Sequence, residues 1–146
     1  MENNGQIRVL AVDDHATFRK GVVLLVGSES DMQVVAEATN GREAVEQFRR
    51  HRPDITLMDL QMDKMCGADA VTAIRSEFPE ARIIVLTTYE GDARVVRAYQ
   101  AGASGYVLKG LVAKDLLDTI RSVHAGAKRI PPGIAAQIKK DANRNL

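Results

Sequence analysis

The sequence predicts a doubly wound α/β fold, in which a five-stranded parallel sheet is covered by helices on both faces. Short apolar runs rich in β-branched residues alternate along the chain with longer segments whose apolar residues recur at helical spacing. The short runs are almost continuously apolar, which is typical of parallel strands buried on both faces. The length of 146 residues fits one domain of this kind.

The first three elements are predicted from their apolar residues. Residues 7–12 are mostly Ile, Val and Leu, which favours a buried strand. A helix is expected over residues 15–26, where apolar side chains from Phe18 to Leu25 recur at helical spacing. The Val-Val-Ala run at residues 34–36 predicts a second, weaker strand.

The middle of the chain repeats this pattern, with clear signals at the ends of its elements. Asn40 is a candidate N-cap for a helix over residues 41–50. Residues 54–58 are predicted to form the third strand. Residues 68–78 follow as a helix, which Pro79 should stop.

Two further strands and two helices are expected before Gly126. The strands are predicted at residues 82–86 and 105–108. The helix over residues 91–100 has a narrow apolar face, whereas the helix over residues 112–124 has a clear one. Gly126 fits as the stop signal of the latter.

The last residues are expected to lie outside this domain. We place the domain at residues 1–127 and a helical extension or linker at residues 128–146. Ile134 and Ile138 predict a helical turn or two. The polar, basic residues 139–146 are typical of a linker rather than of a core.

The overall composition argues against several classes of protein. A formal net charge of +1 gives no reason to expect nucleic-acid binding by this chain itself. The single cysteine, Cys66, and the lack of a signal-peptide pattern favour a cytoplasmic location. The loop after Val12 lacks the glycine-rich pattern of a nucleotide or flavin site.

Polar residues follow four of the predicted strands, at the point where each strand ends. Asp13 and Asp14 follow the first strand, and Asp59 follows the third. Thr87 follows the fourth strand and Lys109 the fifth. Ligands of open parallel sheets bind outside the carboxyl ends of the strands, so we expect these five side chains to converge there.

This set of residues suits phosphoryl chemistry. A carboxylate that attacks phosphorus adds negative charge to a site that is already acidic, and Mg²⁺ and a lysine can neutralise that charge. We therefore expect bound Mg²⁺, with Asp59 as covalent nucleophile and Thr87 as hydrogen-bond donor to the phosphoryl group. Taken alone, each residue also has an ordinary explanation as a helix cap, a turn residue or a solvated charge.

Four short motifs at these strand ends carry a family resemblance. They are Val12-Asp13-Asp14-His15, Leu57-Met58-Asp59-Leu60-Gln61-Met62, Leu86-Thr87 and the run from Ala101 to Lys109. The chain resembles, over about residues 7 to 126, the receiver domain of bacterial two-component response regulators. The resemblance implies the flavodoxin-like receiver fold with strand order 2-1-3-4-5. Thr88-Tyr89 and Ile130-Pro131-Pro132 make the chain similar to the NarL/FixJ (LuxR-type) group.

The resemblance also implies roles for individual residues. Asp59 would accept the phosphoryl group, and Lys109 would pair with that group. Asp14 would be the main Mg²⁺ ligand, assisted by Asp13. Asp59 and the backbone carbonyl of Gln61 would complete the protein ligands.

A conformational switch is implied in the same way. Thr87 would be the hydroxyl that the phosphoryl group draws inward, and Tyr106 would be the aromatic side chain that turns with it. The helix over residues 91–100 and the strand carrying Tyr106 would form the output face. Self-catalysed phosphoryl transfer and hydrolysis would make the chain a switch rather than a turnover enzyme.

The implied partners are a sensor histidine kinase as phosphoryl donor and a second copy of the chain after phosphorylation. Regulators of this group usually carry a helix-turn-helix domain that binds DNA and controls transcription. Such a domain does not fit before Leu146, so we expect the chain to be the receiver part of a longer regulator.

Two alternatives remain open. A phosphatase or phosphotransferase of the haloacid-dehalogenase type would need a second Asp two residues after the nucleophile, where Gln61 stands. A receiver-like module that binds partners without phosphorylation gains support from Asp63, which replaces the family's usual proline beside the metal site. We also expect Tyr89 near the mouth of the site, where its ring would obstruct attacking water.

Overall fold

The structure is a computed structural model that describes residues 5–62, 64–88, 91, 93–110 and 113–144. Its five strands pair in parallel in the order β2-β1-β3-β4-β5, which confirms the predicted fold and strand order. The strands are β1 Ile7–Val12, β2 Met32–Ala38, β3 Ile55–Asp59, β4 Ile83–Thr87 and β5 Gly105–Leu108. The helices are α1 Ala16–Gly27, α2 Gly41–His51, α3 Gly67–Glu77, α4 Ala93–Gln100, α5 Ala113–His124 and α6 Pro132–Arg144.

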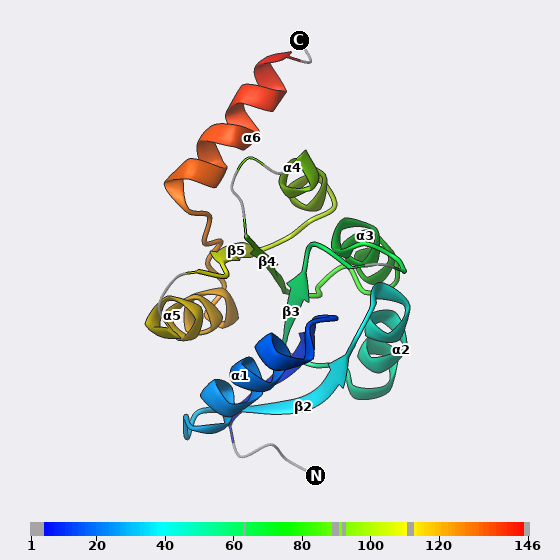
Figure 1. The fold of residues 1–146 in the computed structure, drawn as a ribbon, viewed down its shortest axis with the longest axis vertical. Coiled ribbons are helices and arrows are strands. Elements are labelled where there is room, and N and C mark those ends of the chain that lie inside the picture. Colours follow the sequence, from blue (N-terminus) through cyan, green and yellow to red (C-terminus); the bar gives the residue numbers. More distant parts are fainter. Residues whose placement is uncertain (1–4, 63, 89–90, 92, 111–112, 145–146) are drawn as a thin grey trace.

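The sheet lies between two layers of helices (Figure 1). Helices α1 and α5 cover one face, where Val22 and Ile120 join the strand residues Val9 and Ala11 in one buried cluster. Helices α2, α3 and α4 cover the other face, where a second cluster contains Leu10 and Val12. Because successive strand side chains point to opposite faces, neighbouring residues of β1 serve different clusters, and this explains why its sequence is apolar apart from Arg8.

The structure extends several elements by a residue or more beyond the predicted limits. β2 begins at Met32 and ends at Ala38, because Gln33 and Glu37 pair within it although their side chains are polar. This strand lies at the edge of the sheet, where polar side chains reach solvent and weaken the apolar signal. In contrast, α4 begins at Ala93, two residues after the predicted start.

Asn40 caps α2 as predicted. Its side-chain oxygen accepts a hydrogen bond from the backbone N–H of Glu43 at 2.9 Å. The Glu43 carboxylate in turn accepts a hydrogen bond from the backbone N–H of Thr39 at 2.8 Å. These reciprocal bonds form a capping box, which satisfies backbone donors that a helix start would otherwise leave unpaired.

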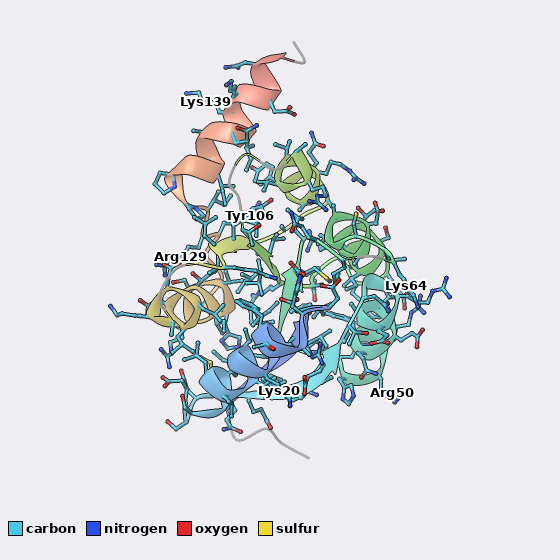
Figure 2. The ribbon with its side chains drawn as sticks, in the orientation of Figure 1. Lys20, Arg50, Lys64, Tyr106, Arg129 and Lys139 are labelled. Atoms are coloured by element: carbon cyan, nitrogen blue, oxygen red, sulfur yellow. The ribbon has the colours of Figure 1, made fainter. Side chains whose placement is uncertain are left out.

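The C-terminal helix is longer than the sequence predicted. In place of a turn or two, α6 has 13 residues and includes part of the polar run. Pro132 occupies its first position, where a proline costs no hydrogen bond. Ile134 is fully buried and belongs to the same core cluster as Tyr106, whereas Lys139 projects outward from the helix (Figure 2). The start of α6 therefore packs on the sheet domain.

No helix among the described residues is long and apolar enough to cross a membrane.

Replacing Asn40 with Ala should lower the free energy of unfolding by about 1 kcal/mol, because the Glu43 N–H loses its acceptor. Urea denaturation followed by circular dichroism measures the change. Asn40→Asp keeps an acceptor oxygen and should stay close to wild type. Equal losses in both variants would contradict the capping role.

Replacing Ile134 with Ala should lower the free energy of unfolding by about 2–5 kcal/mol, because the substitution opens a cavity at a fully buried position. Ile138→Ala is the matched control and should cost less, because Ile138 is only partly buried. If α6 did not pack on the domain in solution, neither substitution would change the urea midpoint.

Candidate functional site

The carboxyl ends of the strands bring the predicted acidic residues and lysine together. Val12 pairs with Met58, so Asp13 and Asp59, the next residues of their strands, lie level with one another. β5 ends at Leu108, opposite Thr87, and Lys109 follows at once. The backbone N–H of Lys109 donates to the carbonyl oxygen of Thr87 at 2.8 Å, which fixes the direction in which its side chain leaves the sheet.

Lys109 joins two of the carboxylates. Its Nζ lies 2.8 Å from Oδ2 of Asp13 and 3.1 Å from Oδ1 of Asp59. The ammonium also lies 4.6 Å from the centre of the Phe18 ring, which shields one side of it. Only 10% of the Lys109 side chain is exposed, so these are charge interactions with little solvent screening.

The two carboxylate oxygens of Asp59 lie in different environments. Oδ1 accepts from Lys109 and from the backbone N–H of Gln61 at 3.3 Å. Oδ2 is buried and has no hydrogen-bond partner in the part of the chain that the structure describes. Burial, followed by the charge of Asp13, raises the pKa of Asp59 to about 6 even though Lys109 opposes the shift. The site thus holds a carboxylate whose charge is incompletely compensated.

Asp13 is better compensated than Asp59. Burial acts to raise its pKa, but hydrogen bonds from the Lys109 ammonium and the His15 backbone N–H outweigh burial and lower that pKa. The His15 N–H donates to Oδ1 of Asp13 at 2.8 Å. Arg19 donates to the backbone carbonyl oxygen of Asp13 at 2.7 Å, which holds the loop after β1 in place.

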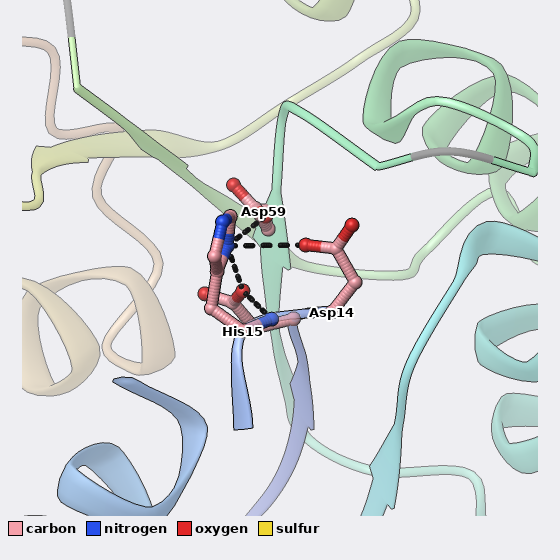
Figure 3. A group of neighbouring side chains, drawn as sticks. Asp14, His15 and Asp59 are labelled. Atoms are coloured by element: carbon pink, nitrogen blue, oxygen red, sulfur yellow. Dashed lines mark hydrogen bonds and ion pairs between the residues drawn. The ribbon is translucent and has the colours of Figure 1, made fainter. Parts of the chain in front are cut away.

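His15 is a member of the site to which the sequence analysis gave no chemical role, although it lies in one of the four motifs. Its Nδ1 lies 3.1 Å from Oδ1 of Asp13, 3.1 Å from Oδ1 of Asp14 and 3.9 Å from Oδ2 of Asp59 (Figure 3). The available signal was its position directly after two acids at a strand end. The imidazole remains 65% exposed and covers the mouth of the acidic cluster.

The residues present fit a divalent cation. Asp13, Asp14, His15 and Asp59 each offer one ligand atom, and these four atoms lie within 4.8 Å of one another. The buried, unpaired Oδ2 of Asp59 is an oxygen that a cation would satisfy. Gln61 contributes its backbone N–H to Asp59, and the expected ligation by its carbonyl oxygen stays a prediction.

Thr87 and Tyr106 lie on neighbouring strands below this cluster. Thr87 is buried at the end of β4, and Tyr106 is fully buried in β5. The Tyr106 hydroxyl donates to the backbone carbonyl oxygen of Val95 in α4 at 2.7 Å. Burial raises the pKa of Tyr106 above its ordinary value, so the hydroxyl stays protonated and keeps this bond. The predicted switch aromatic is therefore turned inward here.

The loop after Asp59 folds back closely on the strand it leaves. The N–H of Gly67 donates to the carbonyl oxygen of Leu60 at 3.3 Å. A Cβ at Gly67 would lie 2.9 Å from the Cα of Leu60 and would collide with the carbonyl oxygen of Asp59. Asp63 and Tyr89, which the sequence analysis singled out, lie outside the described residues.

Comparison with known proteins decides the family. Residues 9–121 match the response regulator receiver domain family. The chain belongs to this family. Receiver domains are the response-regulator side of two-component systems, so the fold and the acidic cluster at its strand ends now have a common explanation.

Individual relatives support the LuxR/NarL-type resemblance. The response regulator protein VraR of Staphylococcus aureus is 37% identical over 133 residues, which cover 91% of this chain and 64% of VraR. A LuxR-family response regulator from Aurantimonas sp. SI85-9A1 has a TM-score of 0.86 and 36% identity, with 94% of this chain and 99% of that one covered.

The receiver domain of the putative response regulator NarL from Mycobacterium tuberculosis gives a TM-score of 0.79 at 33% identity, with 83% of this chain and 98% of that one covered. These solved structures place the receiver domain in the NarL/LuxR-type group. The chain spans less than two thirds of the length of the curated relatives, since it covers 64% of VraR.

Replacing Gly67 with Ala should lower the free energy of unfolding by about 1–3 kcal/mol, because the new methyl group collides with the backbone of Asp59 and Leu60. Gly110→Ala is the matched control, since a Cβ there meets nothing within 4 Å. Urea denaturation compares the two variants. Similar midpoints for both would show that the loop does not approach Asp59 this closely.

Proposed function

We propose that this chain is a phosphorylation switch that accepts a phosphoryl group on Asp59 from the phosphohistidine of a sensor histidine kinase. The observation that carries the proposal is the asymmetric environment of this buried carboxylate. Oδ1 lies 3.1 Å from the Lys109 ammonium, while Oδ2 is buried beside two further acids and has no hydrogen-bond partner among the residues that the structure describes. Oδ1 of Asp59 is thus placed beside a positive charge, and Oδ2 lies at the acidic cluster that we propose binds a cation.

In the proposed transfer, Oδ1 of Asp59 forms the new bond to phosphorus as the bond from phosphorus to the donor imidazole breaks. The electron pair of the broken bond stays on the imidazole nitrogen. Lys109 then pairs with the phosphoryl oxygens, because its ammonium already lies beside Oδ1. Thr87, at the adjacent strand end, donates its hydroxyl to another phosphoryl oxygen. Positioning and charge neutralisation supply the catalysis.

We propose Asp14, Asp13, Asp59 and the backbone carbonyl of Gln61 as the protein ligands of Mg²⁺. Bound Mg²⁺ supplies positive charge to the phosphoryl oxygens, which a site with three carboxylates would otherwise repel. The Asp14 side chain is 28% exposed, so it can turn toward a cation at the mouth of the cluster. Asp13 is held by Lys109 and by the backbone of its own loop.

The proposed output passes through Tyr106. Movement of the Thr87 hydroxyl toward a phosphoryl group favours the inward position of Tyr106, in which its hydroxyl bonds to α4. The backbone N–H of Tyr106 also donates to the carbonyl oxygen of Arg129, just before α6. We propose residues 1–127 as the receiver domain and residues 128–146 as the helical connection to an output domain.

The same proposal includes an output domain, a dimeric partner and a cellular location. The output domain would bind DNA and regulate transcription, because the relatives include LuxR-family regulators, one of them titled a DNA-binding response regulator from Staphylococcus aureus. A second copy of the chain is the proposed partner after phosphorylation. The single cysteine, Cys66, is in keeping with a cytoplasmic location, where phosphohistidine donors of this class act.

Incubation with acetyl phosphate and Mg²⁺ should add one phosphoryl group to the wild-type chain, detected as an increase in intact mass. Asp59→Asn should abolish the adduct, because the amide is not a nucleophile. Asp118→Asn, at a partly exposed position on α5, is the control and should be phosphorylated like wild type. Absence of any adduct on the wild-type chain would favour a receiver-like module that works without phosphorylation.

A further inference from the structure

The Nδ1 edge of the His15 imidazole faces the acidic cluster, although 65% of the side chain is exposed. His15 occupies the N-cap position of α1, yet its side chain makes no capping hydrogen bond. Its carbonyl oxygen accepts from the N–H of Arg19 at 2.9 Å, which is the first hydrogen bond of the helix. Nδ1 of the ring lies within hydrogen-bond distance of Oδ1 of Asp13, at 3.1 Å. Figure 3 shows the ring beside the carboxylates of Asp14 and Asp59.

The spacing around Nδ1 of His15 matches that of ligands sharing one metal ion. Nδ1 lies 3.1 Å from oxygens of Asp13 and Asp14 and 3.9 Å from Oδ2 of Asp59. In an octahedral site with bonds of about 2.1 Å, adjacent ligand atoms are about 3.0 Å apart and opposite ones about 4.2 Å apart. The three distances from Nδ1 lie between these two values, and the 3.1 Å contact with Asp13 is also a hydrogen-bond distance.

A second, independent observation points to a ligand at the same place. The Asp59 side chain is 2% exposed, and its Oδ2 lies 3.9 Å from Nδ1 of His15 and has no hydrogen-bond partner among the described residues. A buried carboxylate oxygen without a partner is costly unless a cation or donor satisfies it.

We infer that His15 is a ligand of the cation site and gives it a preference for divalent transition ions of the Co²⁺, Fe²⁺ and Zn²⁺ class over Mg²⁺. The inference rests on the proposed cation site but not on phosphorylation of Asp59. An imidazole nitrogen beside three carboxylates is a mixed donor set. Imidazole suits these transition ions, whereas Mg²⁺ takes oxygen ligands and retains its waters.

The same distances have a competing explanation, in which a charged His15 ring only neutralises the acids. The two explanations predict opposite signs when the imidazole is removed. A positively charged His15 ring would compete with every cation for the carboxylates, so removal of the ring would strengthen the binding of Mg²⁺ and Co²⁺ alike. If His15 is instead a ligand, its imidazole contributes one bond to Co²⁺, which accepts nitrogen ligands. Removal of the ring would then weaken Co²⁺ binding and leave Mg²⁺ binding nearly unchanged.

Calorimetric titration of the full 146-residue chain with CoCl₂ and with MgCl₂ tests the inference. His15→Ala should lower the Co²⁺ affinity at least about tenfold, a loss typical of a weakened metal site, and change the Mg²⁺ affinity less than about twofold. The visible absorption of bound Co²⁺ should shift as its nitrogen ligand is lost. His51→Ala, at the end of α2, is the matched control for adventitious binding by an imidazole and should behave like wild type.

His15→Gln provides a second variant with a side chain of similar length, and its circular dichroism spectrum checks the fold. Equal effects on the two ions, or stronger binding of both, would overturn the role of His15 while leaving the cation site in place. Failure of wild type to bind either ion would overturn the site and the inference together. Loss of Co²⁺ binding in His51→Ala would also count against His15.

Discussion

The Lys109 ammonium is the interaction on which the arrangement of the site depends. Asp13 and Asp59 come from the ends of different strands, and both are almost completely buried. Two carboxylates at such a place repel one another, and removal of the compensating partner from a buried charge pair typically costs about 3–5 kcal/mol. Lys109 reaches both from the end of β5, so a single cation links the ends of three strands.

Lys109 neutralises only part of the negative charge of the carboxylates, and the remaining negative charge gives the site its chemistry. Three carboxylates face one ammonium and one imidazole that is itself largely exposed. The raised pKa of Asp59 and its unpaired Oδ2 are two consequences of the same excess of negative charge. The fold tolerates this cost because the strands beneath are fully buried and fix the backbone from which the acids project.

The sequence was sufficient to predict the strands and their polar ends, because buried parallel strands are continuously apolar and the residues that break each run are chemically distinctive. Asp59 and Lys109 were found in this way. His15 follows two acids at a strand end, but nothing in the sequence specifies the tight turn after Asp13 that brings its imidazole back over them. Likewise the length of α6 was underestimated, because one buried residue, Ile134, anchors a helix whose other side chains are mostly polar.

The backbone of Arg129 extends the sheet beyond β5. Its N–H donates to the carbonyl oxygen of Ser104, and its carbonyl oxygen accepts from Tyr106, both at 3.0 Å. The outer edge of β5 would otherwise present unpaired donors and acceptors, the kind of edge on which strands of other molecules add and aggregates grow. The segment that leads toward α6 thus also covers the start of this edge strand, and any event that detached it would expose backbone groups on which another strand could pair.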